Sequence, residues 1–76
     1  MFATQLKSFF WVARLGSITQ AARQLRLSQP TVTAQIKALE EQYEVELFTR
    51  QSGRLAITDA GLKLLPEIEK LLLQSA

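Results

Sequence analysis

The chain has 76 residues, enough for one small domain, and its 47% of hydrophobic residues is ordinary for a globular fold. It has no cysteine and no histidine, which excludes a disulfide framework, the usual zinc ligands and catalysis by a thiol or a histidine-based triad. The net charge of +2 is unevenly distributed, since residues 1–39 contain five basic residues and no acid. This asymmetry suits a polyanionic partner, although a solvated charged face without a partner has the same pattern.

A first helix is predicted over about residues 4–15. Its apolar residues recur at three- and four-residue spacing and are expected to share one buried face: Leu6, Phe9, Phe10 and Ala13. Gly16 is expected to end this helix, because glycine adopts the left-handed geometry of a helix terminus without steric cost. Lys7 and Arg14 fall on the outer face with Trp11 between them, which favours a cation stacked on the aromatic ring or a contact with a partner subunit.

Two further helices follow, with only a short turn between them. Ser17 and Gln20 match a capping box at the start of the second helix. The apolar spacing predicts the inner stripe of this helix: Ile18, Ala21, Ala22 and Leu25. Ser28 is expected to cap the third helix, which has Pro30 in its first turn and ends near Tyr43. Its inner stripe follows at four-, three- and four-residue steps: Val32, Ile36, Leu39 and Tyr43.

The pattern changes after the third helix. Apolar residues alternate with residues of other character on each side of the turn Gln51-Ser52-Gly53: Val45 and Leu47, then Leu55 and Ile57. Alternation around a glycine-containing turn predicts a β-hairpin. Thr58 and Asp59 are expected to cap a last helix, in which Pro66 removes a backbone hydrogen bond and is expected to cause a bend.

Three helices, a short β-hairpin and a last helix predict a mainly α fold of the winged helix-turn-helix class. In this class the third helix enters the major groove of DNA, N-terminus first. The polar residues expected to point outward from it toward bases or phosphates are Gln29, Thr31, Thr33 and Lys37. Arg50 and Arg54 flank the hairpin turn, where a wing contacts phosphates or the minor groove. Each of these side chains can equally be solvated surface, and spacing alone leaves both interpretations open.

The chain also resembles a known family, the LysR-type transcriptional regulators, over nearly its whole length. The most specific segments of the resemblance stand at the family's distances from one another: Ala21-Ala22, Ser28-Gln29-Pro30, Leu47-Phe48 and Thr58-Asp59-Ala60-Gly61. The resemblance implies a regulator that binds an inverted repeat in double-stranded promoter DNA as a homodimer. The residues that it implies at bases or phosphates are Gln29, Pro30, Thr31, Thr33, Arg50 and Arg54. One position departs from the family's pattern, since the family usually has arginine or lysine where this chain has Ala34. Lys37, one turn further on, is at most a partial replacement for that cation.

The resemblance further implies a division of the chain. Residues 1–58 are expected to form the DNA-binding winged helix-turn-helix, and residues 59–76 a linker helix that pairs antiparallel with its partner. The residues expected at this dimer interface are Leu64, Ile68, Leu71 and Leu72. Because the family continues into an effector-binding domain, we expect the chain to be a fragment whose small-molecule effector binds that absent domain. The expected location is the cytoplasm, since no segment resembles a targeting signal or a membrane span.

Two alternatives come from other functional classes. A winged-helix domain can bind a protein instead of DNA. Such a module would present apolar anchors on the outer face of the third helix, where this chain has glutamine, threonines and lysine. An enzyme has little support, because there is no glycine-rich phosphate loop and the glutamates near the end of the third helix look solvated. No cofactor and no metal are expected.

Overall fold

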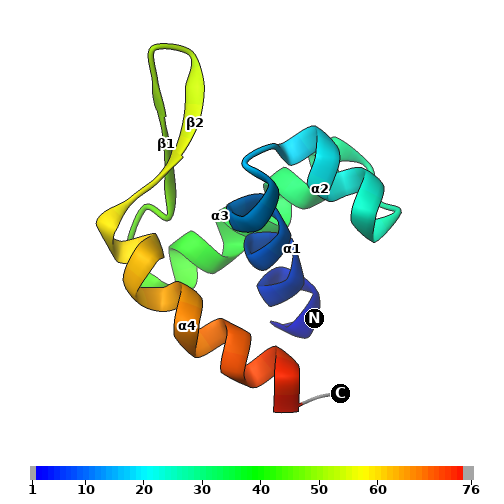
Figure 1. Ribbon diagram of the computed structural model, residues 1–76, viewed down its shortest axis with the longest axis vertical. Coiled ribbons are helices and arrows are strands. Elements are labelled where there is room, and N and C mark those ends of the chain that lie inside the picture. The colour runs from blue at the N-terminus through cyan, green and yellow to red at the C-terminus, as the bar shows by residue number, and fades with distance from the viewer. Residues whose placement is uncertain (1, 75–76) are drawn as a thin grey trace.

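The computed structural model describes residues 2–74, which form four helices and a two-stranded antiparallel hairpin (Figure 1). In chain order the elements are α1 Phe2–Leu15, α2 Ile18–Leu25, α3 Gln29–Tyr43, β1 Phe48–Gln51, β2 Arg54–Ile57 and α4 Asp59–Gln74. This is the order of a winged helix-turn-helix with an additional C-terminal helix, so the predicted fold class is confirmed. Within residues 2–74, no helix has the length and apolar character needed to cross a membrane.

The helix boundaries follow local capping interactions. Gly16 ends α1 with a left-handed backbone, at a φ angle of 67°. Ser17 caps α2, since its side-chain oxygen accepts a hydrogen bond from the Gln20 amide at 3.1 Å. Ser28 caps α3 in the same way, accepting from the Thr31 amide at 3.2 Å. Because each bond joins residues three apart, these boundaries were predictable from the sequence.

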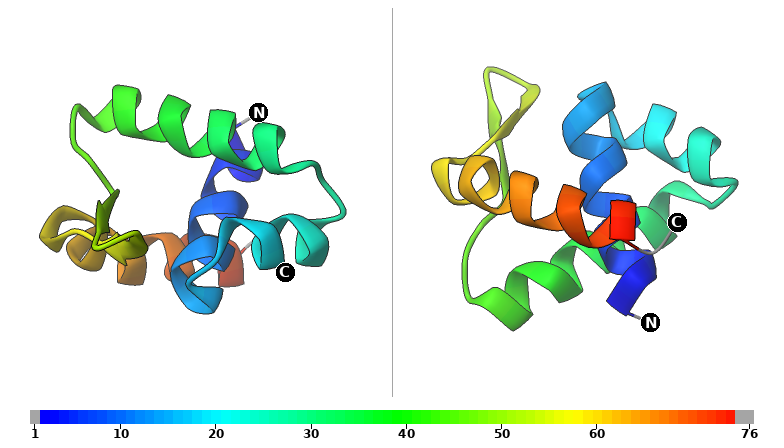
Figure 2. Two further views of the ribbon diagram at one scale, coloured as in Figure 1. Left: turned by 90° about the horizontal axis from the view of Figure 1, so that it is seen from above. Right: turned by 60° about the horizontal axis from the view of Figure 1, so that its bottom comes forward.

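Helix α1 is the centre of the fold, because it packs against α2, α3 and α4 (Figure 2). A buried cluster joins it to the helix-turn-helix pair, and we call this the helix-turn-helix cluster: Val12, Ala21, Ala22, Val32 and Ile36. The two alanines let α2 approach its neighbours closely. The predicted inner stripes of α2 and α3 therefore do form the core between these helices.

A second buried cluster lies under the hairpin, and we call it the wing-base cluster: Leu6, Phe9, Leu39, Leu47 and Ile68. It joins α1, α3 and α4 to the segment that leads into β1. Phe48 packs against both clusters, and its ring lies 5.5 Å from that of Phe9. Phe48 thereby connects the first residue of the hairpin to both halves of the core.

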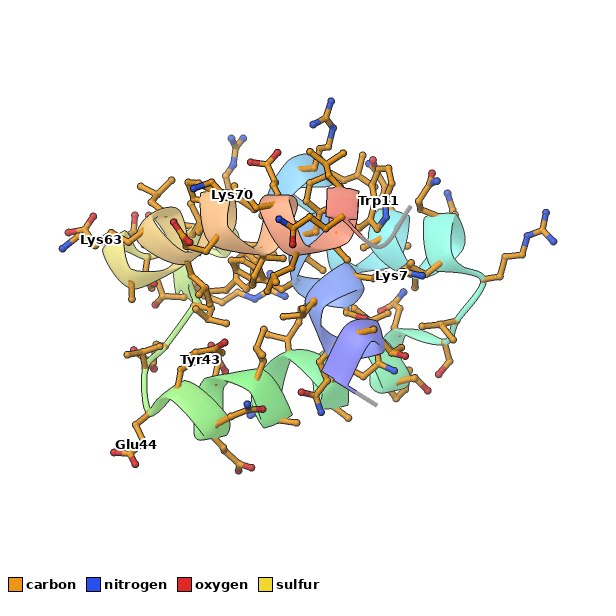
Figure 3. All side chains as sticks on the ribbon, turned by 90° about the horizontal axis from the view of Figure 1, so that it is seen from below. Lys7, Trp11, Tyr43, Glu44, Lys63 and Lys70 are labelled. Carbon is orange, nitrogen blue, oxygen red and sulfur yellow. The ribbon has the colours of Figure 1, made fainter. Side chains whose placement is uncertain are left out.

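Two details of the predicted helix faces were wrong. On α1, Phe10 and Ala13 are only half-buried, whereas Ser8 and Val12 are fully buried. The buried face of α1 is broader than one stripe because three helices pack around it. On α3, Tyr43 is 41% exposed, because the last turn of the helix extends beyond α1, as Figure 3 shows.

The first strand was predicted too early in the chain. Val45 is exposed and Leu47 is fully buried, but both precede β1, which starts at Phe48. A left-handed residue, Glu44, ends α3 at a φ angle of 57°. The carboxylate of Glu40 then accepts hydrogen bonds from the amides of Leu47 at 2.8 Å and Phe48 at 3.4 Å. This side chain holds the segment as a bent connection, and strand pairing begins only after it.

The hairpin turn is a two-residue loop. Ser52 and Gly53 both have positive φ angles, 52° and 77°, between the paired residues Gln51 and Arg54. Two successive positive φ angles are typical of the type I′ turn, whose twist matches that of the flanking strands. The predicted turn is confirmed, although Gln51 belongs to β1 and not to the loop.

The start of α4 is connected to the base of the hairpin. The hydroxyl of Thr58 accepts a hydrogen bond from the Gly61 amide at 3.0 Å, as predicted for a cap, and donates one to the Glu46 carbonyl at 2.5 Å. The Thr58 amide donates to the Leu47 carbonyl at 3.0 Å. Helix α4 then continues through Pro66 as a single element.

Candidate nucleic-acid interface

The N-terminal half of α3 presents the side chains that were predicted to contact DNA. Its buried residues point toward α1 and α2: Val32, Ile36 and Leu39. At 3.6 residues per turn, the opposite side of the helix carries a row that we call the outer ridge: Pro30, Ala34 and Lys37. All three residues of the ridge are exposed. Gln29 and Thr33 lie beside this ridge, on the flank that faces the hairpin.

That flank borders a polar cleft of about 560 Å³ between α3, the start of α2 and the hairpin. In Figure 1 the hairpin and the start of α2 rise on the same side of the molecule. The residues that line this cleft, which we call the reading cleft, are Gly16, Ser17, Ile18, Thr19, Gln29, Thr33, Arg50, Gly53, Arg54 and Leu55. The lining includes two arginines and no acid, which suits a phosphate backbone.

The two wing arginines are exposed and lie next to the hairpin turn. Arg50 pairs with Leu55 across the hairpin, and its guanidinium Nη1 is 3.5 Å from the Gly53 carbonyl, to which it donates. Leu55 packs against the helix-turn-helix cluster, so the wing is held beside α3. The hairpin thus directs its cations toward the same cleft that Gln29 and Thr33 border.

Gly61 fixes the contact between α4 and the base of the wing. A Cβ atom at this position would lie 2.6 Å from Ile57 Cγ1 and 2.7 Å from the Leu47 carbonyl oxygen. The second contact is with backbone, which cannot move aside as a flexible side chain can. Only glycine therefore permits α4 to approach the hairpin this closely.

A buried polar pair sets the position of α3 against α1. The hydroxyl of Ser8, which is fully buried, donates a hydrogen bond to Oε1 of Gln35 on the inner flank of α3. A buried donor and acceptor match in only one register, whereas apolar side chains can slide past one another. This pair therefore contributes to the orientation from which Gln29 and Thr33 project.

The charge of α3 changes sign along its length. Its first ten residues contain one cation, Lys37, and no acid. Acids then gather around the C-terminal end of the helix, where they line a shallow hollow with Lys37: Glu40, Glu41, Glu44 and Glu46. Because carboxylates repel phosphates, the N-terminal end of the helix is the end that suits a polyanionic partner. In the described part of the chain no group of acidic residues is arranged to hold a metal ion.

The structure brings four of the seven predicted DNA-binding residues together in the reading cleft: Gln29, Thr33, Arg50 and Arg54. Pro30 and Lys37 lie on the outer ridge instead. Thr31 lies on the far flank of α3, where its hydroxyl is 2.8 Å from the Ser28 hydroxyl. Sequence reasoning missed Ser17 and Thr19, which line the cleft from the start of α2. The only sequence signal for them was their position directly after the glycine that ends α1.

The predicted dimer-interface residues do not share one exposed face of α4. Ile68 is only 1% exposed and belongs to the wing-base cluster, so its assignment to an interface was wrong. Leu64 and Leu72 are half-buried against the same cluster, and Leu71 is 45% exposed. Two leucines that were not predicted are more exposed, Leu62 at 54% and Leu73 at 76%. The spacing of leucines thus located the apolar residues of α4 but not the direction in which each one points.

Leu73 borders a largely apolar groove between α1 and α4. The residues that line this groove are Ala3, Lys7, Phe10, Trp11, Arg14, Glu69, Leu72 and Leu73. The guanidinium of Arg14 lies over the ring of Phe10, 5.9 Å from its centre, and Phe10 meets Trp11 edge to face at 5.2 Å. The predicted stacked cation therefore exists, but on Phe10 and not on Trp11. Figure 3 shows Trp11 close to the C-terminal end of α4.

Comparisons with known proteins agree with this architecture. The sequence profile described as "Bacterial regulatory helix-turn-helix protein, lysR family" matches residues 3–62. An uncharacterized HTH-type transcriptional regulator of Azotobacter vinelandii is 40% identical over 72 residues, which cover 95% of this chain and 50% of the relative. The HTH-type transcriptional regulator CbbR of Xanthobacter flavus is 46% identical over 67 residues, which cover 88% of this chain and 20% of the relative. The chain thus spans half or less of these relatives.

Solved structures of this kind include complexes with DNA. The DNA-binding domain of CbnR, crystallised with DNA, is 36% identical with a TM-score of 0.90, and the match covers 99% of this chain and 86% of that one. The DNA-binding domain of BenM, in complex with catB site 1 DNA, is 32% identical with a TM-score of 0.91, covering 99% and 84%. On the profile match, the relatives and the fold, this chain belongs to the LysR family of bacterial regulatory helix-turn-helix proteins.

Proposed function

We propose that this chain binds double-stranded DNA sequence-specifically, as the reading head of a LysR-type transcriptional regulator. The observation that carries the proposal is the reading cleft, in which the exposed Gln29 and the half-buried Thr33 of α3 line the same surface as two wing arginines. The similar domains of CbnR and BenM, which were crystallised with DNA, support the same activity. In this arrangement α3 enters the major groove N-terminus first, and the wing follows the adjacent backbone.

Each group in the cleft has a distinct role in this proposal. Gln29 can make two hydrogen bonds with an adenine edge, and Thr33 can contact a phosphate or a thymine methyl. Arg50 and Arg54 neutralise phosphates or enter the minor groove beside the wing, while Lys37 supplies a cation one turn further along α3. The first amides of α2 and α3 add partial positive charge at the same surface.

The proposal extends to a homodimer. Leu62 and Leu73 are eleven residues apart, which is about three helical turns, so they project from the same side of α4. These two exposed leucines, with Leu73 bordering the groove that contains Trp11, favour pairing with the α4 of a second copy. Two copies related by a two-fold axis would read half-sites separated by about 34 Å or a multiple of it, as an inverted repeat requires.

The proposal also assigns separate functions to two segments of the chain. Residues 1–58 read the DNA, and the segment 59–76, whose described part is α4, provides the surface through which copies pair. The site of action is the cytoplasm, because bacterial promoters are located there. Response to a small-molecule effector is assigned to a further domain, in agreement with the greater length of the relatives.

A protein-interaction module is less compatible with the described surface. The large apolar side chains that are exposed between residues 3 and 74 are Tyr43, Val45, Leu62, Leu71 and Leu73. None of them lies in the N-terminal half of α3, where a protein ligand would need an anchor. Small and polar side chains occupy that surface, as base recognition requires.

The direct test is selection of bound sites from random DNA duplexes, followed by affinity measurements on the selected site. Gln29→Ala should weaken binding to that site by about 1–3 kcal/mol and relax the preference at one base pair. Gln42→Ala is the matched control, because Gln42 is an exposed glutamine near the other end of α3 and should leave affinity unchanged. Failure to enrich any site would overturn the proposal, and equal losses in both variants would remove Gln29 from the reading face.

A further inference from the structure

The outer ridge of α3 has an apolar stretch at the position where a recognition helix comes closest to the bases. Pro30 and Ala34 are four residues apart, so they are neighbours on the helix surface, and both are exposed. Neither one is needed for the core, which α3 contacts through Val32, Ile36 and Leu39. The polar residues Gln29 and Thr33 flank this stretch on the wing side.

The chemistry of this stretch limits which base edge it can recognise. Guanine is read by paired donors and cytosine by an acceptor, whereas adenine requires one of each. The side chains of Pro30 and Ala34 carry neither a donor nor an acceptor. The remaining feature of the major groove that matches an exposed methyl group is the C5 methyl of thymine. Because the alanine side chain ends at Cβ, it also permits a close approach of the helix backbone to the groove floor.

We propose that Ala34, together with Pro30, reads the C5 methyl group of one thymine in each half-site. This inference rests on the proposed DNA binding and specifies part of the sequence that the domain selects. Lys37, on the next turn of the same ridge, supplies affinity for phosphate without reading that base. The ridge therefore specifies thymine through its methyl group, while Gln29 specifies its own base by hydrogen bonding.

The test uses the unaltered chain and the site selected from random duplexes. Each thymine of the site is replaced in turn by deoxyuridine, which pairs identically but lacks the methyl group. At one thymine position in each half-site, the change to deoxyuridine should lower the affinity of the chain for the site about fourfold, which corresponds to about 0.8 kcal/mol for a buried methyl group. A site with 5-methylcytosine·G in place of this T·A pair should be bound more tightly than a site with unmethylated C·G there, because the methyl group is restored at the same place.

A variant assigns the methyl contact to Ala34 and not to Thr33. In Ala34→Ser, the difference in affinity between the thymine and the deoxyuridine sites should fall below fourfold, because a hydroxyl group is added to the apolar contact surface while Pro30 stays in place. Gln42→Ala is the control, since Gln42 is an exposed residue near the other end of α3 and its substitution should preserve the fourfold difference.

The outcomes separate the two proposals. Tight binding to a selected site that tolerates deoxyuridine everywhere would overturn the methyl contact and leave sequence-specific DNA binding intact. Sensitivity to deoxyuridine that persists undiminished in Ala34→Ser would also overturn the role of Ala34. Failure of the chain to select any duplex would overturn both proposals together.

Discussion

Glu40 links the recognition helix to the wing, and its removal provides a sharp test of how the wing is held. Its carboxylate accepts hydrogen bonds from the amides of Leu47 at 2.8 Å and Phe48 at 3.4 Å, and Leu47 is fully buried. In Glu40→Ala these amides lose their acceptor at the point where the chain enters the core. Glu41→Ala is the matched control, because Glu41 is exposed and adjacent on the same helix.

The magnitude follows from the two distances. A hydrogen bond to a charged group contributes about 1.5–3 kcal/mol to stability, and the longer bond to Phe48 adds little. Alanine raises helix propensity and removes an unfavourable acid from a helix C-terminus, but these gains of a few tenths of a kcal/mol apply equally to the control. The difference between Glu40→Ala and Glu41→Ala should therefore be about 2 kcal/mol. Glu40→Gln should lose about half of this, since it keeps an acceptor without the charge.

Thermal unfolding followed by circular dichroism measures the difference directly. For a domain of this size, about 2 kcal/mol corresponds to a decrease in Tm of roughly 8–16 °C relative to the control. DNA binding gives a second measurement, because losing an acid strengthens nonspecific binding in both variants, whereas only Glu40→Ala should loosen the wing and weaken binding to the selected site. Melting temperatures within about 2 °C for Glu40→Ala and Glu41→Ala would refute the reasoning.

Three further predictions concern the wing and α4. Gly61→Ala should destabilise the fold by about 1 kcal/mol in urea unfolding, since overpacking against Leu47 outweighs the gain in helix propensity; a more stable variant would contradict the contact. Arg54→Ala should weaken specific and nonspecific DNA binding alike and reduce the salt slope by about one, and an unchanged slope would remove Arg54 from the phosphate contacts. Leu73→Glu should shift sedimentation from dimer to monomer while the circular dichroism spectrum of the folded domain stays unchanged, because Leu73 is 76% exposed; a persistent dimer would argue against pairing through α4.

The sequence predicted the helices well because their boundaries depend on nearby residues. The caps formed by Ser17, Ser28 and Thr58 each join groups three residues apart, so composition and spacing suffice to locate them. The buried stripes of α2 and α3 follow from helical periodicity in the same way. The turn at Ser52 and Gly53 is equally local, since it depends on two residues with positive φ angles.

The first strand shows where local reasoning ends. Val45 and Leu47 alternate with polar residues as a strand would, but the carboxylate of Glu40 accepts hydrogen bonds from the amides of Leu47 and Phe48, seven and eight residues later. Whether a carboxylate on a helix reaches a later backbone amide depends on the angle at which the chain leaves that helix. That angle is fixed by the core and not by the alternating pattern.

The direction of each leucine on α4 illustrates the same limit. A stripe that faces the core and a stripe that faces a second chain have the same helical spacing, so Ile68 was assigned to an interface although it lies in the wing-base cluster. The spacing of apolar residues gives the period of an amphipathic helix, whereas packing against α1 decides how α4 is rotated about its own axis. Leu62 and Leu73 became candidates for pairing only once that rotation was known.

By itself, the sequence determined the class of fold, the basic N-terminal half and the polar residues at the start of α3, because these depend on composition and on contacts within a few residues. Only the tertiary structure decided that Ser17 and Thr19 share a cleft with Arg50 and Arg54, more than thirty residues later. The physical reason is that a reading surface is assembled by packing helices at fixed angles. Those angles are set by the whole core, through pairs such as Ser8 and Gln35, and by no single segment.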